Sequence, residues 1–282
     1  LSGGDDRNLM ERLLEKQIPL SNSCNGKGTC GKCKVRVVSG TITDVTDTER
    51  RLLTEKEVAG RMRLACMTKA RGEVVIETGE GEEDHVFTTG GVEGHFERDA
   101  DKHGYGLAVD IGTTTVVATL VNMDDGTEGP TYAQINPQKT YGLDVLTRIT
   151  YETEHKEAAI SQLQKAIVQG LNEAATAVCN EAGIEVTEIT EIDVAANCTM
   201  LHMLAGVDAR PIGRAPYKPA FTDGQKLKAR DLGLMGAAGA MVYLLPSVSA
   251  YIGADIVAGV YVCDLRHSPG KTLFIDIGTN GE

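Results

Sequence analysis

The pattern of hydrophobic and polar positions along this chain changes near residue 105. Before that point the apolar runs are short and predict small elements separated by glycine-rich loops. The first run, residues 9–20, has helical spacing and is closed by Pro19. The other elements expected here are a strand over 34–38, a helix over 49–57 and a closing strand over 74–76. Residues 1–79 are therefore the first expected domain.

From Tyr105 onward, strands and helices alternate. The expected strands span residues 106–110, 115–121, 192–196, 243–245 and 273–276, and the expected helices span 156–182, 199–204 and 248–262. The longest helix keeps Ile160, Leu163 and Ile167 on one face and stops at Gly183. This alternation predicts an α/β domain over residues 105–282. Residues 80–104 are rich in Gly, Glu and Asp without periodicity, so we expect a linker there.

Net charge narrows the classes of partner. The 282 residues carry a formal charge of −12, which argues against nucleic acid and anionic membranes, because both bind basic surfaces. Lys27, Lys32 and Lys34 nevertheless cluster in the first domain, where they either dock an acidic partner or only keep their loop solvated. Residues 234–253 are uncharged and long enough to cross a membrane, but Pro246 and many small residues favour a buried strand followed by a helix. We therefore expect a soluble protein.

The cysteines carry the most specific chemistry in the sequence. Cys24, Cys30 and Cys33 lie on one glycine-rich loop in the pattern C-x5-C-x2-C, and Cys66 returns from a distance. Three thiolates on a tight loop plus a distant fourth are typical of a [2Fe–2S] site, because glycines let the backbone wrap the inorganic sulfides. The alternative is a structural zinc site. Zinc sites usually pair two C-x2-C knuckles, however, and the second knuckle is missing.

The cysteine loop resembles that of adrenodoxin-like ferredoxins, being one residue longer than the plant-type spacing. With the elements expected around it, this resemblance implies a β-grasp ferredoxin-like fold for residues 1–79. The remaining cysteines, Cys179, Cys198 and Cys263, sit in apolar surroundings and are expected to be inert core thiols. Seven cysteines without an even disulfide framework indicate a reducing compartment, so we expect the cytoplasm.

A second chemical signal occurs twice in the α/β domain. Asp110-Ile-Gly-Thr-Thr114 and Asp276-Ile-Gly-Thr-Asn280 each follow an apolar strand. A carboxylate at a strand end can hold Mg²⁺ through water, and a glycine lets the backbone N–H groups approach a phosphate. We therefore predict two facing phosphate loops with Asp110 and Asp276 at Mg²⁺. The expected phosphate-binding residues are Gly112, Thr113, Thr114, Gly278, Thr279 and Asn280.

Paired Asp-x-Gly-Thr loops also occur in pepsin-like aspartic proteases, whose two carboxylates share a proton. That fold is nearly all β, whereas a helix of about seven turns is expected between the two loops here. Ile111 and Ile277 also stand where those proteases usually carry Thr or Ser. The sequence therefore favours a nucleotide-binding domain over a protease.

The paired loops resemble the phosphate-1 and phosphate-2 motifs of the superfamily that contains acetate and sugar kinases, actin and heat-shock chaperones. The segment from Pro246 to Gly259 is similar to that superfamily's first interdomain helix. The chain as a whole resembles the ATP-dependent reductive activators of corrinoid proteins over nearly its whole length. The features that carry this resemblance are the ferredoxin unit at its start and the motifs Asn136-Pro-Gln138 and Asn197-Cys-Thr-Met200. That family usually has Gly-Asn-Thr where this chain has Ala196-Asn197-Cys198.

The resemblance implies an enzyme that reduces a Co(II) corrinoid to Co(I) with one electron from a [2Fe–2S] cluster, driven by ATP with Mg²⁺. It implies a corrinoid protein as partner, and it leaves the electron donor and the oligomeric state, a homodimer included, open. Glu282 or Asp255 is a candidate for orienting the attacking water. Two other functions stay open: a cluster-regulated small-molecule or acyl kinase of the same superfamily, and an electron-transfer scaffold whose nucleotide domain does not hydrolyse ATP.

Three further expectations concern the ends and the interior of the α/β domain. The chain begins with Leu1 and stops at Glu282 directly after the second expected loop, so we expect an actin-like (ribonuclease H-like) ATPase domain truncated at its C-terminus. Asp144 and Arg148 lie one turn apart and are expected to form a local ion pair. His202 lies on an apolar helix face and is expected to be a packed core histidine.

Overall fold

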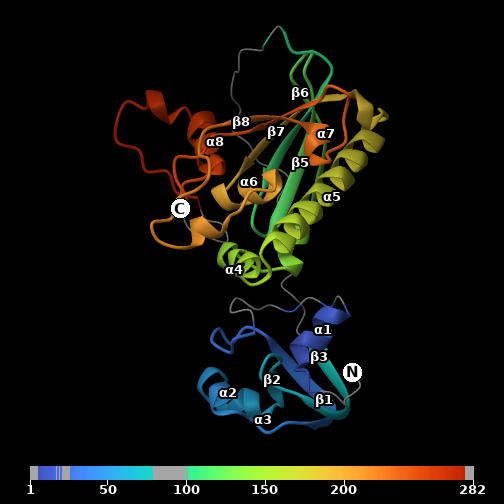
Figure 1. Ribbon diagram of the computed structural model, residues 1–282, viewed down its shortest axis with the longest axis vertical. Coiled ribbons are helices and arrows are strands. Elements are labelled where there is room, and N and C mark those ends of the chain that lie inside the picture. Colours follow the sequence, from blue (N-terminus) through green and yellow to red (C-terminus); the bar gives the residue numbers. More distant parts are fainter. Residues whose placement is uncertain are drawn as a thin grey trace. The chain divides into compact units, whose positions relative to one another are not determined.

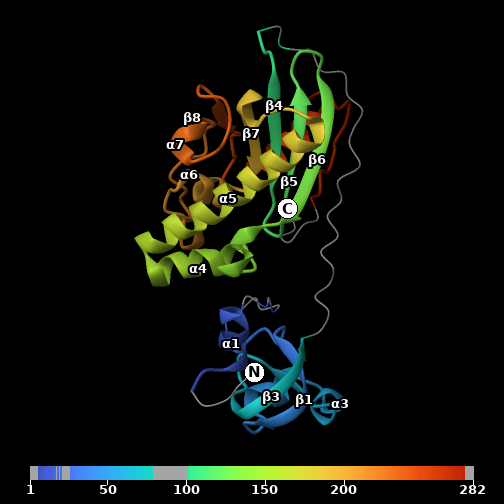
Figure 2. The same ribbon diagram turned by 90° about the vertical axis from the view of Figure 1, so that its right-hand side faces the viewer.

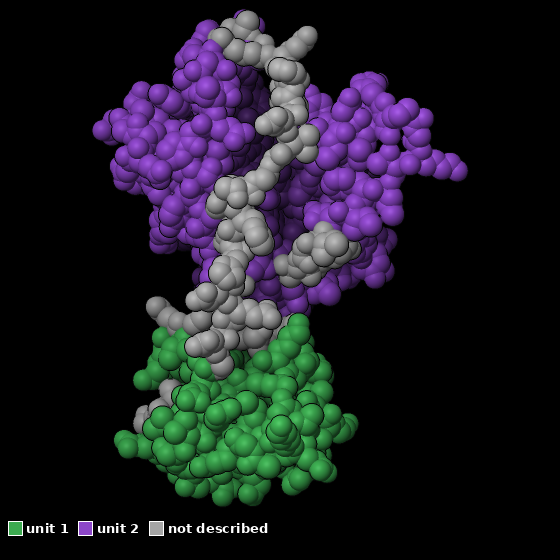
Figure 3. All heavy atoms as spheres, turned by 180° about the vertical axis from the view of Figure 1, so that it is seen from behind, with its two compact units in different colours: residues 1–84 green, residues 85–282 purple. Residues whose placement is uncertain are grey.

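The computed structural model describes residues 6–16, 18, 20, 26–78, 99 and 101–276. The chain divides into two compact units, residues 1–84 and 85–282 (Figure 3). Several expected site residues lie outside the described ranges, namely Cys24, Gly278, Thr279, Asn280 and Glu282. Within those ranges, none of the helices combines the length and the apolar composition that crossing a membrane requires.

The first unit is built on a three-stranded antiparallel sheet of order β2-β1-β3 (Figure 1). Its elements are α1 (Leu9–Glu15), β1 (Lys34–Ile42), α2 (Asp47–Leu52), α3 (Glu55–Ala59), β2 (Met62–Leu64) and β3 (Ala70–Thr78). Val35 and Leu64 from the sheet are fully buried against Leu9 and Leu13 of α1. The expected strands at 34–38 and 74–76 are confirmed, and both are longer than the sequence pattern predicted.

The single helix expected over 49–57 is wrong, because the segment forms two helices. Thr46 and Thr54 each form a capping box with the glutamate three residues later, Glu49 and Glu57. Thr54 therefore begins a new helix, and Leu53 before it is extended. The helix expected over 9–20 is shorter for a similar local reason: it ends at Glu15, where the N–H groups of Lys16 and Ile18 both turn back to the Leu13 carbonyl.

The second unit contains a six-stranded mixed sheet of order β6-β5-β4-β7-β9-β8 (Figures 1 and 2). Its strands are β4 (Tyr105–Ile111), β5 (Thr115–Asn122), β6 (Thr127–Ile135), β7 (Ile189–Ala196), β8 (Gln225–Lys228) and β9 (Met241–Leu244). β4, β5 and β6 form an antiparallel meander, whereas β7 and β9 continue parallel to β4. The parallel register pairs Ile111 with Ala196, so β4 and β7 end at the same edge of the sheet.

Helices α4 (Val145–His155), α5 (Glu157–Ala182) and α6 (Cys198–Ala205) form the helical layer, in which α5 lies across one face of the sheet (Figures 1 and 2). The remaining elements are α7 (Ala229–Leu232), α8 (Ala254–Val262) and the 3-10 turns η1 (Pro137–Thr140), η2 (Val186–Glu188), η3 (Arg210–Gly213) and η4 (Leu265–His267). The expected apolar face of α5 is confirmed, since Leu163, Ile167 and Leu171 are buried. On the other face, Asp110 and Asp193 alternate with the buried residues of β4 and β7.

Three expectations near the end of the chain are wrong. Cys263 was expected to be a core thiol and is exposed, whereas Cys179 and Cys198 are buried as expected. The helix expected over 248–262 begins only at Ala254, because the Ser249 hydroxyl accepts from the N–H groups of Tyr251 and Ile252 and so competes with helical bonding. The strand expected over 273–276 has no ladder partner within the described part of the chain. Instead Phe274 packs on Gly259 of α8, and Leu273 is 82% exposed.

Candidate cluster and nucleotide sites

In the first unit, two of the four expected cluster ligands come together. Cys33 precedes β1 and Cys66 follows β2, and the pairing of Lys34 with Leu64 places the two Sγ atoms 3.3 Å apart. Both side chains are buried, and Cys30 lies half-buried on the same loop. Among the described residues no three His, Cys, Asp or Glu side chains converge on one metal position. The full set of four ligands therefore stays a prediction.

The loop around these thiols has the close packing that a metal–thiolate group needs. Gly28 has φ of +71°, and a Cβ atom there would lie 2.7 Å from Cε of Met67, the residue that follows Cys66. The backbone of the cysteine loop thus passes directly over the turn that carries the distant cysteine. Two buried, converging thiols under such a loop fit a [2Fe–2S] group.

A buried ion pair, which the sequence analysis missed, holds the turn around Cys66. The Glu49 carboxylate accepts from Nε and Nη2 of Arg63 at 2.9 Å each, and its Oε1 also accepts from the Leu64 N–H and the Thr68 hydroxyl at 3.1 Å. Burial alone would raise the pKa of Glu49, but the hydrogen bonds from Arg63 and the backbone outweigh it and lower the pKa to about 2. The bonds to Leu64 and Thr68 bracket Cys66 on both sides.

The three lysines near the cysteine loop separate in the structure. The ammonium group of Lys34 pairs with Glu57 at 2.6 Å, whereas Lys27 and Lys32 are exposed. An acidic partner could therefore be met by Lys27 and Lys32 without breaking an ion pair.

In the second unit, the first predicted phosphate loop lies at the edge where β4 and β7 end. The loop joins β4 to β5, and a Cβ atom on Gly112 would lie 2.9 Å from the Thr115 carbonyl oxygen, so the chain passes through too little space for a side chain. Asn197 directly follows β7, caps α6 through the Met200 N–H, and donates from Nδ2 to Oγ1 of Thr113 at 3.2 Å. Asn197 is thus placed at the loop despite the altered residues beside it.

Two other carboxylates act electrostatically on Asp110. Desolvation by the surrounding protein, and then the charges of Asp255 and Asp276, raise the pKa of Asp110 to about 6. Desolvation and the charge of Asp276 likewise raise the pKa of Asp255, which lies in the first turn of α8. Gly253 brings this turn against β7, because a Cβ atom there would lie 2.5 Å from the Cα atom of Asn197. The shared Mg²⁺ site of Asp110 and Asp276 stays a prediction.

The local ion pair expected between Asp144 and Arg148 is wrong. Asp144 caps α4 by accepting from the N–H and hydroxyl groups of Thr147, whereas Arg148 is fully buried beneath the phosphate loop. The guanidinium donates to the carbonyl oxygens of Thr113 and, at 2.9 Å, Gly142. The one-turn spacing suggested that Asp144 pairs with Arg148, but the Asp144 carboxylate instead accepts the capping hydrogen bonds from Thr147.

His202 is a core residue, as expected. Its ring stacks on Phe221 at a centroid distance of 4.1 Å. Nδ1 donates to the Cys198 carbonyl oxygen at 2.8 Å, and Nε2 accepts from the Ala220 N–H at 3.0 Å. Burial lowers the pKa of His202, which agrees with this neutral tautomer.

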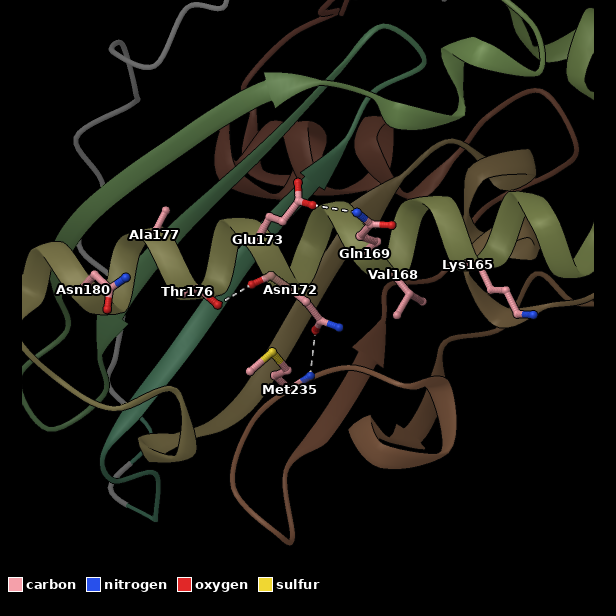
Figure 4. A pocket seen from close by; sticks show the side chains of 9 residues that line it. All are labelled: Lys165, Val168, Gln169, Asn172, Glu173, Thr176, Ala177, Asn180 and Met235. Carbon is pink, nitrogen blue, oxygen red and sulfur yellow. Dashed lines mark hydrogen bonds between the residues drawn. The ribbon is translucent and has the colours of Figure 1, made fainter. Parts of the chain in front are cut away.

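A groove along the outer side of α5 is separate from these residues (Figure 4). Its lining side chains come from α5 and from Met235. Asn172 bridges them by donating to the Gly233 carbonyl oxygen and accepting from the Met235 N–H. None of the predicted ligand or phosphate residues lines it.

The fold and the cysteine loop together define a ferredoxin-like unit joined to an α/β domain, in which the phosphate loop stays a prediction. Residues 1–71 match the family model of the 2Fe-2S iron-sulfur cluster binding domain, and residues 105–268 match that of the RACo middle region. Because the second match covers more than half of the sequence, the chain belongs to the RACo middle-region family.

Known relatives agree with both assignments. Corrinoid activation enzyme RamQ of Eubacterium limosum is 33% identical over 182 residues, which are 64% of this chain and 30% of that protein. A component of the Na(+)-translocating NADH-quinone reductase of Chlamydia felis is 33% identical over 72 residues, 26% of this chain and 16% of that protein. The solved structure of a reductive activator for a corrinoid, iron-sulfur protein matches all of this chain with a TM-score of 0.62 and 28% identity. The chain spans 59% of that structure.

Proposed function

We propose that this chain belongs to an ATP-dependent enzyme that returns an oxidised Co(II) corrinoid protein to the Co(I) state. One electron passes from an upstream one-electron donor through the iron–sulfur unit to cobalt. The observation that carries the proposal is the combination in one chain of converging cluster thiols and a carboxylate-lined phosphate loop. The match over the whole chain to a solved reductive activator of a corrinoid iron–sulfur protein supports it.

Each unit has a defined part in this proposal. Cys24, Cys30, Cys33 and Cys66 hold the [2Fe–2S] group, which supplies one-electron transfer when bound. Asp110 and Asp276 hold Mg²⁺, and Gly112, Thr113 and Thr114 bind phosphate oxygens of ATP. Asp255, in the first turn of α8, is placed to orient water at the same edge. The charges of Asp255 and Asp276 raise the pKa of Asp110, which supports this assignment because a divalent cation bound at Asp110 would relieve that repulsion.

The second loop completes the proposed site on its opposite side. Gly278, Thr279 and Asn280 follow Asp276 and bind further phosphate oxygens, with Glu282 as the other candidate for the water. Lys27 and Lys32 provide a small basic surface beside the cluster loop for an acidic patch of the corrinoid protein. The cysteine usage supports a reducing, cytoplasmic location.

The first test is the metal content of anaerobically purified protein together with an EPR spectrum after dithionite reduction. We expect two irons and two sulfides per chain and an S = ½ signal. Cys66→Ser should lose iron, while Cys263→Ser, at an exposed cysteine of the other unit, should keep it. Zinc, or iron that survives Cys66→Ser, would contradict the cluster assignment.

The second test separates the reductase from a kinase or a passive scaffold. Dithionite-reduced protein is mixed with a Co(II) corrinoid protein, and the Co(II) EPR signal is followed with and without MgATP. We expect the signal to disappear faster with MgATP. Loss of the signal at the same rate without nucleotide indicates a scaffold, and no loss in either case removes the corrinoid partner from the proposal.

A further inference from the structure

A layer of buried polar side chains lies directly behind the first phosphate loop. Asn136, Gln138 and Arg148 are all fully buried, and they come from η1, its cap and α4. Asn136 donates from Nδ2 to the Gly112 carbonyl oxygen at 2.8 Å and from its backbone N–H to the Thr114 carbonyl oxygen at 2.8 Å. Arg148 donates from Nη2 to the carbonyl oxygen between them, that of Thr113.

Three consecutive carbonyl groups of the loop are thus held from one side. The loop peptides are trans, since the one cis bond among the described residues precedes Pro216. In a trans peptide the C=O and the following N–H point in opposite directions. Fixing the carbonyl groups of Gly112 and Thr113 toward Asn136 and Arg148 therefore aims the N–H groups of Thr113 and Thr114 away from the helical layer. That direction leads to the sheet face on which Asp110 lies.

Arg148 is itself held from several directions. Its Nε donates to the Gly142 carbonyl oxygen at 2.9 Å, and its Nη1 contacts Oε1 of Gln138 at 3.3 Å and Sδ of Met200 at 3.0 Å. Gln138 is in turn tied to α5, because its Nε2 donates to the Leu163 carbonyl oxygen at 3.0 Å. Such a fork, with its donors spread over several acceptors, fixes the guanidinium plane.

The charge of this arginine is unusual for a buried residue. The acceptors that its guanidinium meets in the described chain are carbonyl oxygens, the Gln138 amide oxygen and the Met200 sulfur, and Asp144 attracts it only from further away. Burial lowers the pKa of Arg148 only to about 10, so the group stays cationic at neutral pH. An unpaired buried cation is costly unless another negative charge comes near. A phosphate bound on the opposite side of the loop would supply one.

We propose that Arg148 is a positioning residue for the polyphosphate chain of a nucleoside triphosphate. Together with Asn136 it orients the peptide units of residues 112–114 from the side of the helical layer. Its hydrogen bond to the Thr113 carbonyl oxygen also polarises that peptide, which makes the Thr114 N–H a stronger donor to a bound phosphate. The proposal rests on the proposed ATP site. Beyond that site, it assigns to Arg148 and Asn136 the role of setting the loop's affinity for phosphate without contacting the ligand.

The test measures the dissociation constants of the full chain for MgATP and for magnesium tripolyphosphate, which lacks the nucleoside. Arg148→Met keeps the length of the side chain and removes its charge and donors. Gln164→Met is the matched control, since Gln164 also donates from a helix to a backbone carbonyl, that of Leu204 at 3.1 Å, but away from the loop. Arg148→Met should weaken both ligands at least tenfold and by the same factor. Gln164→Met should stay within about threefold of the wild type.

The outcomes separate this proposal from the function on which it rests. Wild-type affinity in Arg148→Met overturns the positioning role and leaves the ATP site intact. A wild-type chain that binds neither probe overturns the ATP site, and the positioning role with it. Should Arg148→Met fail to fold, Arg148→Lys answers instead. A single ammonium cannot span the carbonyls of both Gly142 and Thr113, so a partial loss is expected, and unchanged affinity for both probes refutes the two-carbonyl contact.

Discussion

In the proposed nucleotide site, the raised pKa of Asp110 should make Mg²⁺ binding depend on pH in a range where an ordinary aspartate does not titrate. A proton and Mg²⁺ compete for the same carboxylate. With a pKa of about 6, about 91% of Asp110 is ionised at pH 7 and about 9% at pH 5, so its contribution to Mg²⁺ affinity falls about tenfold between them. At the ordinary value of 3.8, the ionised fraction would change by less than about a tenth over the same range.

The assay is isothermal titration of MgATP at pH 5, 6, 7 and 8, on the wild type, Asp110→Asn and Asp193→Asn. ATP itself titrates in this range, so the relevant quantity is the ratio of wild-type to Asp110→Asn affinity. This ratio should fall about tenfold from pH 7 to pH 5. Asp193→Asn removes another exposed carboxylate of the same sheet and should follow the wild type. A ratio that does not change with pH would refute the electrostatic reasoning for Asp110.

Three further predictions concern the supports of the two sites. Burial raises the pKa of the fully buried Glu152 from 4.5 to about 7, so ionisation of this group lowers the stability of the fold as the pH rises between those values. In urea unfolding, Glu152→Gln should therefore be more stable than the wild type by about 3 kcal/mol at pH 8 and by about 1 kcal/mol at pH 5. An equal gain at both pH values contradicts this. Glu49→Gln should destabilise the first unit by about 1.5–3 kcal/mol and lower its iron content, because it removes the buried ion pair with Arg63. Glu57→Gln, in the neighbouring capping box, is the control and should retain iron. Equal iron in both variants argues that the buried ion pair does not support the turn around Cys66. A Cβ atom at Gly142 would lie 2.6 Å from the Thr147 hydroxyl, so Gly142→Ala should lower the melting temperature and weaken MgATP binding. Gly239 has open space around it, and Gly239→Ala should change neither quantity. Wild-type behaviour of Gly142→Ala would show that α4 can shift without disturbing the loop at residues 112–114.

The sequence was most informative where the chemistry and the local structure depend on the same few residues. A buried run ending in Asp110-Ile-Gly predicted both a strand and the turn after it, and the structure has β4, the loop and β5 at those positions. The repeat at Asp276 predicted a second carboxylate facing the first, and the charge of Asp276 contributes to the raised pKa of Asp110. The cysteine spacing likewise predicted the convergence of Cys33 and Cys66.

Tertiary partners explain what sequence reasoning missed. Arg148 had a plausible partner one turn away, and only the fold shows that Thr147 occupies Asp144 while three loop carbonyls need donors from behind. Glu49 was readable as a helix cap, but its bonds to Arg63 and Thr68 join residues 14 and 19 positions apart. The strand expected at 273–276 was inferred from apolar residues alone, and such runs form strands only beside a partner.

The parallel pairing of β4 with β7 also has a consequence for how the chain folds. Its register joins Tyr105 to Ile189, so the pair can form only after the intervening residues, α4 and α5 included, have crossed the sheet. The β4–β5–β6 meander is local and can assemble earlier, which leaves one edge of β4 open in the meantime. Contacts of such long range slow folding, and open strand edges invite pairing with other chains. Low temperature and slow expression should therefore raise the yield of the correctly folded chain.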